Sequence, residues 1–296
     1  MAQASRIEWT DATWNPVIGC TRVSEGCQHC YAERLSRHFG WTDQPWTAAH
    51  AEDVVRVRWD RLETPVHWRR PRRIFVNSLS DLFHETIPDN APAGDDAFRD
   101  AVFGIMALTP WHTYQVLTKR IERAAAWWTD PQRQDRVALA AIRWKSGLPP
   151  GTHRDVVWEH VPWPLPNVWL GVSVETQRRA AERLPVLASL PAAVRFVSCE
   201  PLLEPVDLQP WLAHLDWVIV GGESGPGARP LDDDWVRAIR DQCQAAGVPF
   251  FFKQRVRRGR KESLPWLDGR RWAETPRAPL GGPARAHQEA QTWCTS

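Results

Sequence analysis

Residues 168–174 read VWLGVSV, a short run rich in β-branched and aromatic residues that ends at the polar residue Glu175. A run of this kind, bounded by polar or Gly/Pro residues, is typical of a buried strand. Because its apolar residues follow one another without alternation, we expect a sheet that is covered on both faces. Five further runs have the same character, at 74–77, 114–117, 194–198, 217–220 and 249–252, and one more strand is expected within 7–18.

Helical patterns lie between several of these runs, at 95–108, 176–190 and 232–246. In the first of them, apolar residues recur at a spacing that places them on one helix face, and the last begins with an acidic cluster that suits a helix N-terminus. Repeated alternation of strand and helix predicts a mostly parallel sheet with right-handed crossovers. The sequence therefore predicts an α/β fold with about six to seven parallel strands.

Length and charge limit the class of protein. The chain has 296 residues, which suits one α/β barrel or two modest domains. A net charge of +2 excludes a strong attraction to polyanions from bulk charge alone, although local basic patches remain open. We find no apolar run long enough to cross a membrane and no secretory signal pattern at the N-terminus, so we expect a soluble, cytoplasmic protein without membrane partners.

We predict one domain over residues 1–273, with a cysteine loop at 19–33 and an insertion at 129–166 that carries a helix near 133–144. Residues 274–296 are rich in Pro, Ala and Gly, and this composition buries little apolar surface. We therefore expect a flexible tail.

Polar and charged residues directly follow the predicted strands. In a parallel barrel these positions meet at the rim formed by the carboxyl ends of the strands, where the fold places its active site. Helix caps and salt bridges would also put polar residues there, but repetition after six strands favours a functional site. The series comprises Asn77, Ser78, Ser80 and Asp81; Thr118, Lys119 and Arg120; Ser173 and Glu175; Ser198 and Glu200; Gly221, Gly222, Glu223 and Ser224; and Lys253 and Gln254.

Residues 19–33 read GCTRVSEGCQHCYAE and place Cys20, Cys27 and Cys30 in a Cys-x6-Cys-x2-Cys pattern. The other three cysteines are scattered along the chain. A local triplet of thiols in a reducing compartment favours a metal site over disulfides.

The spacing leaves three interpretations of this triplet open. The first is an iron–sulfur cluster, in which three cysteines hold three irons and the fourth iron stays free for a ligand. The second is a structural zinc site with His29 or His38 as the fourth ligand. In the third, the cysteines pack as small apolar residues without a metal.

The order of motifs along residues 7–254 resembles the phage Gp37/Gp68 family, also called DUF5131 or three-Cys-motif proteins. The motifs are IEWTDATWNPVIGCTRVSEGCQHCYAE, IFVNSLSDLFHE, VLTKR, LGVSVE, SCEPLL, VIVGGESGPGARP and PFFFKQ. The resemblance implies a partial TIM-type (β/α) barrel related to radical S-adenosylmethionine (SAM) enzymes, with spore photoproduct lyase as a distant likeness. Two features depart from the radical SAM pattern. The first cysteine gap has six residues instead of three, and the GGE sequence at 221–223 follows a late strand instead of the second.

The resemblance implies that Cys20, Cys27 and Cys30 ligate a [4Fe–4S] cluster whose open iron binds SAM. Electron transfer from a donor protein or reductant would then release a 5′-deoxyadenosyl radical that takes a hydrogen from the substrate. The expected SAM-binding residues are Asn77, Ser78, Asp81, Ser173, Glu175, Glu200, Gly222 and Glu223.

Three further residues are expected to take part in the reaction. Lys119 and Lys253, like the neighbouring Arg120, suit a carboxylate or a substrate phosphate. Cys199 would donate a hydrogen atom, as a cysteine does in the photoproduct-lyase-like case, or is instead a small buried residue.

Two basic runs, HWRRPRR at 67–73 and RVRRGRK at 255–261, suggest nucleic acid as a partner, although such runs are also typical of solvated faces. The leading hypothesis is thus a radical SAM-like iron–sulfur enzyme that repairs or modifies nucleic acid. The alternative is a non-catalytic zinc or iron–sulfur protein that binds nucleic acid or a partner. A metal-dependent hydrolase is a weaker third hypothesis, because His84 is the nearest histidine to the predicted rim.

Overall fold

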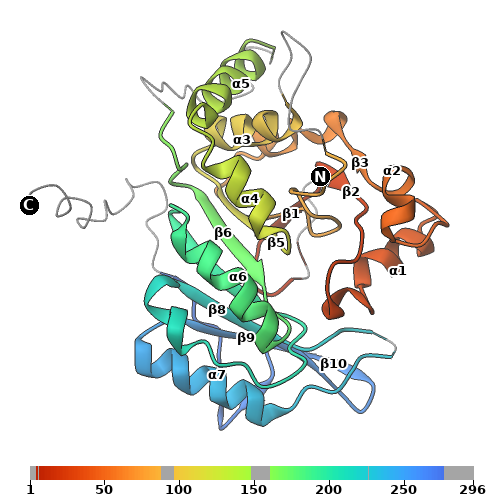
Figure 1. Ribbon diagram of the computed structural model, residues 1–296, viewed down its shortest axis with the longest axis vertical. Helices are drawn as coiled ribbons and strands as arrows, with labels where there is room; N and C mark the ends of the chain where they lie inside the picture. Colours follow the sequence, from red (N-terminus) through yellow and green to blue (C-terminus); the bar gives the residue numbers. More distant parts are fainter. Residues whose placement is uncertain (1–4, 6, 88–96, 148–160, 226, 277–296) are drawn as a thin grey trace, which may run out of the picture.

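The computed structural model describes residues 5, 7–87, 97–147, 161–225 and 227–276, and a curled, mostly parallel sheet of eight strands forms its centre (Figure 1). The strand order is β1-β4-β5-β6-β7-β8-β9-β10, in which all neighbours are parallel except β9 and β10. The sheet curves into a half-barrel. Its strands are β1 (Ala12–Trp14), β4 (Arg73–Val76), β5 (Thr113–Thr118), β6 (Val168–Ser173), β7 (Val194–Cys199), β8 (Trp217–Gly221), β9 (Phe250–Arg257) and β10 (Arg260–Ser263).

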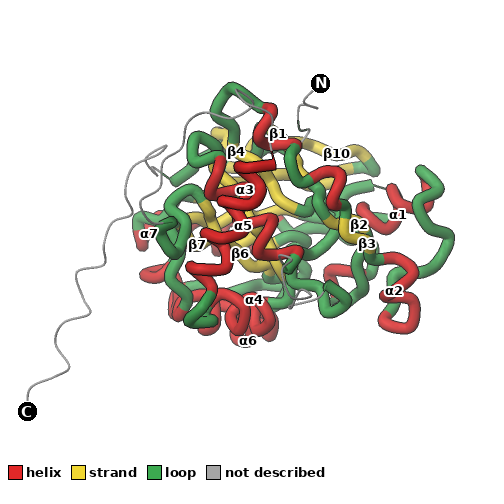
Figure 2. Tube along the Cα trace, turned by 90° about the horizontal axis from the view of Figure 1, so that it is seen from above, coloured by secondary structure: helices red, strands yellow, loops and turns green. Residues whose placement is uncertain are grey.

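Most helices follow a strand and return along the outside of the sheet. Figures 1 and 2 show α1 and α2 apart from the group α3 to α6. The α-helices are α1 (Tyr31–His38), α2 (Ala51–Val54), α3 (Phe98–Leu108), α4 (Ile121–Trp128), α5 (Arg133–Gly147), α6 (Gln177–Ser189) and α7 (Asp233–Ala246). Short 3-10 helices lie at Glu25–Cys27, Ala48–His50, Trp59–Arg61, Thr64–His67 and Gln209–His214. Two small antiparallel pairs join β2 (Val17–Ile18) to β3 (Arg56–Val57) and β11 (Trp266–Leu267) to β12 (Arg270–Arg271).

The predicted parallel sheet is confirmed, with seven parallel strands among the described residues. The strand expected to end at Phe252 continues instead to Arg257, because β10 pairs with its second half. Arg255 and Glu262 are register partners in this hairpin, and their side chains form an ion pair with an N–O distance of 2.8 Å. A polar strand end of this kind carries no apolar signal in the sequence.

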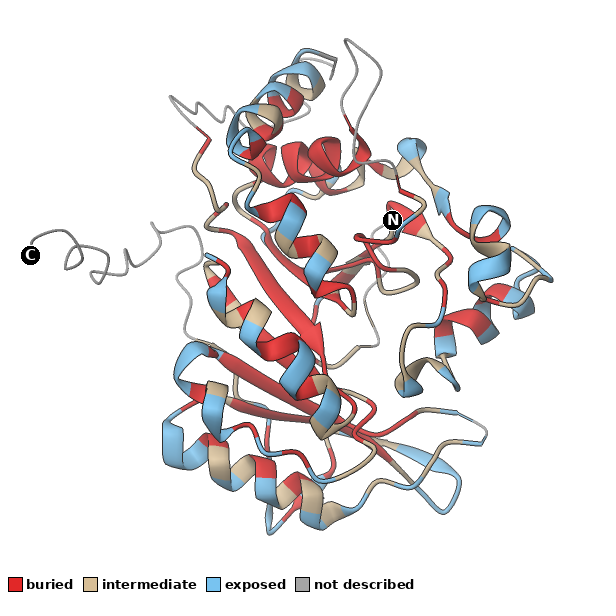
Figure 3. Ribbon diagram, in the orientation of Figure 1, coloured by how far each residue is buried: buried red, intermediate tan, exposed pale blue. Residues whose placement is uncertain are grey.

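Both faces of the sheet are apolar, and a different set of residues covers each. One face packs against the helices, and strands β4 to β8 are almost entirely buried, whereas β10 is mostly exposed (Figure 3). The opposite face holds a separate aromatic cluster, in which Trp9 lies 4.7 Å from Phe75 and 6.0 Å from Trp217 between ring centroids. A Cβ atom on Gly171 would lie 2.5 Å from the ring of Phe196, so a glycine is required beside that ring. The aromatic side chains fill this face below the carboxyl ends of the strands.

The insertion carries α5, which is longer than the helix expected near 133–144 and packs on α3 through an ion pair between Arg133 and Asp100. Residues 148–160 of the insertion, and 277–296 of the expected tail, lie outside the described residues. Glu274 is hydrogen-bonded to the backbone of Phe250, so the described chain stays attached to the sheet beyond residue 273. No helix in the described ranges has the length and apolar character needed to cross a membrane.

Candidate functional site

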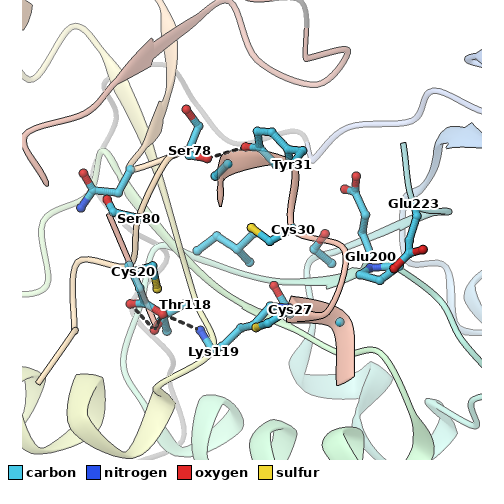
Figure 4. Close-up of a pocket in the computed structure, with 18 of the residues that line it drawn as sticks. Cys20, Cys27, Cys30, Tyr31, Ser78, Ser80, Thr118, Lys119, Glu200 and Glu223 are labelled. Atoms are coloured by element: carbon cyan, nitrogen blue, oxygen red, sulfur yellow. Dashed lines mark hydrogen bonds between the residues drawn. The ribbon is translucent and has the colours of Figure 1, made fainter. Parts of the chain in front are cut away.

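A cavity of about 180 Å³ lies at the carboxyl ends of the parallel strands, and Cys20, Cys27 and Cys30 line it. Figure 4 shows the three cysteines standing around one space, with Glu200 and Glu223 on one side and Thr118 on the other. Cys20 follows β2, Cys27 ends a 3-10 turn, and Cys30 is the residue before α1. None of the described cysteines forms a disulfide. The sequence triplet is therefore a spatial cluster of reduced thiols at the rim.

The glycines of the cysteine loop allow it to approach its neighbours closely. Gly19 has a φ of +83°, and a Cβ atom there would lie 1.7 Å from the carbonyl oxygen of Val54. A Cβ atom on Gly26 would lie 2.5 Å from Cγ of Glu175. Because only glycine fits either position without displacing its neighbours, these residues fix the path of the loop.

The sulfur of Cys20 is in contact with a buried arginine. Nη1 of Arg120 donates to Sγ of Cys20 over 3.4 Å, and the thiol itself points at the carbonyl oxygen of Thr21 over 3.4 Å. Burial raises the pKa of Cys20 to about 12, although the charge of Arg120 acts to lower it. A bound metal would replace the thiol proton, and the positive charge of Arg120 would then lie beside the thiolate.

Cys27 has a different environment. Burial acts to raise its pKa, but the charge of Lys119 and hydrogen bonds from Val23 and Ser24 outweigh burial, so the pKa is lowered. Lys119 in turn forms an ion pair with Glu175, whose side chain is fully buried. The negative charge of Cys27 raises the pKa of both other cysteines, so the three thiols lie within electrostatic reach of one another.

Nine of the eleven rim residues expected to bind SAM or to react line this cavity. Glu175 and Cys199 are the two that do not. The nine are Asn77, Ser78, Asp81, Lys119, Ser173, Glu200, Gly222, Glu223 and Lys253.

Glu175 lies beneath the cysteine loop. Its carboxylate accepts from Oγ of Ser24 at 2.8 Å and from Nη1 of Arg183 at 3.0 Å, in addition to the ion pair with Lys119. Burial acts to raise the pKa of Glu175, but the two cations outweigh it and the pKa is lowered. This residue holds the loop in place.

Two of the acidic residues in the lining are also committed to protein partners. Asp81 accepts from Oγ1 of Thr118 at 2.8 Å and from the backbone N of Lys119 at 3.0 Å, which ties the loop after β4 to the end of β5. Glu223 accepts from the backbone N of Arg229 at 2.8 Å and from Nδ1 of His29 at 2.9 Å. These carboxylates position the walls of the cavity.

Other lining groups keep hydrogen-bonding capacity. Asn77, which is 2 % exposed, accepts from the backbone N of Val17 at 3.1 Å, while its Nδ2 atom has no partner among the described residues. Oγ of Ser198, in a residue that is 1 % exposed, likewise has none within the described chain. Glu200 accepts from Nζ of Lys253 and from Nε2 of Gln254 at 3.1 Å. A buried polar atom without a partner is costly, so these positions suit a polar ligand.

Cys199 packs in the core between the sheet and the helices, where it is fully buried together with Cys243. Burial raises its pKa well above the ordinary thiol value. Its neighbours Ser198 and Glu200 line the cavity, because successive side chains of a strand point to opposite faces. The sequence showed that Cys199 lies at a strand end, but it did not show which face of the sheet its side chain is on.

Several residues that line the cavity were not predicted as site residues. Trp9 lies in the chain before β1, and Tyr31, the first residue of α1, donates a hydrogen bond from its hydroxyl to the carbonyl of Ser78. Neither follows a strand, so the strand-end pattern could not find them. Thr118, Ser80, Arg120, Ser198 and Gln254 were in that pattern and also line the cavity.

The histidines named as alternative ligands are separated. His29 lines the cavity and contacts Glu223. His38 is exposed at the end of α1, and Nε2 of His84 lies 2.8 Å from Oγ1 of Thr21. Within the described ranges, no group of three or more His, Cys, Asp or Glu residues is arranged to hold a metal ion.

The two basic runs lie at opposite ends of the sheet. Residues 67–73 lead into β4, whose first residue is Arg73, and so lie at its amino end, away from the cysteines. Residues 255–261 continue from the lining residues Lys253 and Gln254 into the β9–β10 hairpin. Arg257, Arg258 and Arg260 are exposed at its tip. The second run is therefore the one beside the cavity.

Residues 4–276 match the family model for DUF5131, described as a protein of unknown function. The chain belongs to the DUF5131 family. No curated protein and no solved structure gives a significant match to it. The match includes the cysteine loop and every strand of the half-barrel, so the site described above lies within the DUF5131 domain.

Proposed function

We propose that this DUF5131 protein is a radical SAM-like iron–sulfur enzyme. The observation that supports it is the meeting of three reduced thiols with unpartnered polar groups in one cavity at the carboxyl ends of a parallel half-barrel. This is the edge at which parallel barrels place their active sites. The proposal includes a kinship with TIM-type radical SAM barrels and with the phage Gp37/Gp68 proteins.

The donor set suits an iron–sulfur cluster better than a single metal ion, for which no three such ligands converge in the described ranges. Thiolates are the ligands of such clusters, and each thiolate binds a different iron, so the sulfurs stand apart around the cluster. Cys20, Cys27 and Cys30 surround a common space in this way (Figure 4). Arg120 and Lys119 place positive charge beside Cys20 and Cys27, which favours the deprotonated form that binds iron.

When bound, the cluster and SAM would supply the one-electron cleavage that yields a 5′-deoxyadenosyl radical. The protein would bind the polar ends of SAM through Asn77, Ser198 and Glu200. Lys253, which pairs with Glu200, would face a carboxylate or a phosphate. The role of Asp81, Glu175 and Glu223 is to hold the loops that carry these groups, since their oxygens already accept from protein donors.

We extend the proposal to nucleic acid as substrate. The exposed arginines at the tip of the β9–β10 hairpin follow the lining residues Lys253 and Gln254 along the chain and suit phosphate groups. Repair or modification of a base would require the substrate to approach along this hairpin. The other basic run, at 67–73, lies at the far end of the sheet and is less suited to deliver a substrate.

A non-catalytic zinc or iron–sulfur protein that binds nucleic acid is the second candidate. The observation that favours it is that Glu175 and Glu223 each form ion pairs with cations of the protein itself. A binding protein would also need such ion pairs for stability. Glu200, Asn77 and Ser198 distinguish the two candidates, because a purely structural metal loop does not require them.

The test is SAM cleavage by anaerobically prepared protein. Dithionite stands in for the physiological electron donor, and the product measured is 5′-deoxyadenosine. We expect SAM-dependent product from the wild-type protein, and its loss together with bound iron in Cys20→Ala, Cys27→Ala and Cys30→Ala. Cys199→Ala is the matched control that should keep its iron. A wild-type protein that holds zinc and leaves SAM intact would support the second candidate instead.

A further inference from the structure

Arg120 is a buried cation in the cavity lining, and the sequence suggested a carboxylate or a phosphate as its ligand. Its side chain is 4 % exposed, and all parts of the guanidinium are in use. Nε donates to Glu85 at 2.9 Å, and Nη2 donates to Oγ1 and to the carbonyl of Thr21, at 2.9 and 3.2 Å. Nη1 lies 3.4 Å from Sγ of Cys20 and 3.5 Å from Oδ2 of Asp81.

These contacts fix the direction of the guanidinium. Arginine presents its donors in one rigid plane, so the bonds to Glu85 and Thr21 determine where Nη1 points. Nη1 points at the sulfur of a proposed iron ligand. Because Thr21 is the next residue after Cys20, the same group also holds the backbone that carries this sulfur.

We propose that Arg120 is a positioning residue that donates a hydrogen bond to the Cys20 thiolate and makes the cluster easier to reduce. This inference rests on the proposed function. Reduction adds one negative charge, and both a hydrogen bond to a cluster sulfur and a nearby positive charge stabilise the reduced form more than the oxidised form. The guanidinium itself is buried, which limits screening of its charge by water.

Glu85 acts against this effect. Its side chain is 52 % exposed and pairs with Nε of Arg120, on the side of the guanidinium away from the sulfur. The carboxylate partly neutralises the cation. Removal of Arg120 and removal of the Glu85 charge should therefore move the reduction potential in opposite directions, which a merely structural role for Arg120 would not produce.

The experiment is a reductive titration of the iron-loaded protein, followed by EPR and optical spectra, for the wild type, Arg120→Gln, Glu85→Gln and Arg123→Gln. Arg123 is the control. It lies nearby on α4, and it donates at 3.1 Å to the carbonyl of Phe83, in the loop after β4 that also carries Glu85. At a fixed solution potential, we expect the ratio of reduced to oxidised cluster to fall about tenfold in Arg120→Gln, the size of one charge-assisted hydrogen bond. It should rise in Glu85→Gln and stay unchanged in Arg123→Gln.

Equal potentials in wild type, Arg120→Gln and Glu85→Gln would overturn the inference while leaving the proposed function intact. If Arg120→Gln holds no iron, Glu85→Gln decides alone, and an unchanged potential there overturns the inference. A wild-type protein that binds no iron after reconstitution would overturn the proposed function and this inference with it.

Discussion

The ammonium group of Lys119 forms an ion pair with the carboxylate of Glu175, and that carboxylate lies against Gly26 of the cysteine loop. One buried pair thus connects the ends of β5 and β6 to the loop that carries Cys27. The same lysine lowers the pKa of Cys27. The stability of the loop and the reactivity of its central thiol therefore depend on the same two residues.

Glu175→Gln should destabilise the fold by about 3–5 kcal/mol, because it leaves Lys119 and Arg183 buried without their counter-charge. Denaturant unfolding measures the change. Glu182→Gln is the matched control, since Glu182 pairs with Arg178 and Arg179 at the surface of α6 and should cost much less. Equal losses in the two variants would contradict the structural role given to Glu175.

The stabilisation by Glu175 should depend on pH in a defined direction. The pKa of Glu175 is lowered from its ordinary value of 4.5 in the folded protein, so the folded state favours the charged form. Its contribution is complete above the ordinary carboxyl range and is lost as pH falls through the lowered folded value. The difference in unfolding free energy between wild type and Glu175→Gln should therefore be constant near neutral pH and shrink below pH 4.5. A difference that grows on acidification would contradict this sign.

In the metal-free protein, Cys27 should react with iodoacetamide at least about tenfold faster than Cys20 or Cys30 at pH 8, since the thiolate is the nucleophile. All three residues are partly exposed, so their different pKa values should decide the order. Peptide mass spectrometry of a time course gives the rates. Lys119→Gln should slow Cys27 specifically, and an unchanged rate in that variant would remove Lys119 as the cause.

Gly19→Ala should unfold or displace the cysteine loop, because the new methyl group would overlap the Val54 carbonyl. Gly247→Ala is the control: Gly247 also has a positive φ, of +70°, but has no atom within 4 Å of the added Cβ, so its cost should be about 1 kcal/mol. Thermal unfolding and iron content measure both variants. The account requires a clearly larger loss in Gly19→Ala.

If nucleic acid binds at the hairpin, Arg258→Ala with Arg260→Ala should weaken binding of a poly(dT) oligonucleotide and reduce its salt slope by about 1.4. Arg69→Ala with Arg70→Ala, at the far end of the sheet, should leave the slope unchanged. Fluorescence anisotropy over a range of salt concentrations measures both. A smaller salt slope only in the Arg69 and Arg70 variant would place the phosphate contacts in the other basic run, at residues 67–73.

The strands were predictable because each is a short apolar run between polar residues, and this pattern also placed their carboxyl ends together. The direction of individual side chains was less accessible. Strands that are apolar on both faces have no alternation, so the sequence could not tell that Ser198 faces the cavity and Cys199 the core. Nor could it show that Arg183, from the helix after β6, donates a hydrogen bond to the carboxylate of Glu175.

The central claim is that Cys20, Cys27 and Cys30 hold an open-site iron–sulfur cluster that binds SAM. Its most direct test is anaerobic purification and reconstitution, with quantitation of iron and sulfide and EPR spectra of the reduced protein before and after SAM is added. We expect about four irons per chain, as a [4Fe–4S] cluster requires, and an EPR signal that SAM changes. Zinc without iron, or a cluster signal that SAM leaves unchanged, would contradict it.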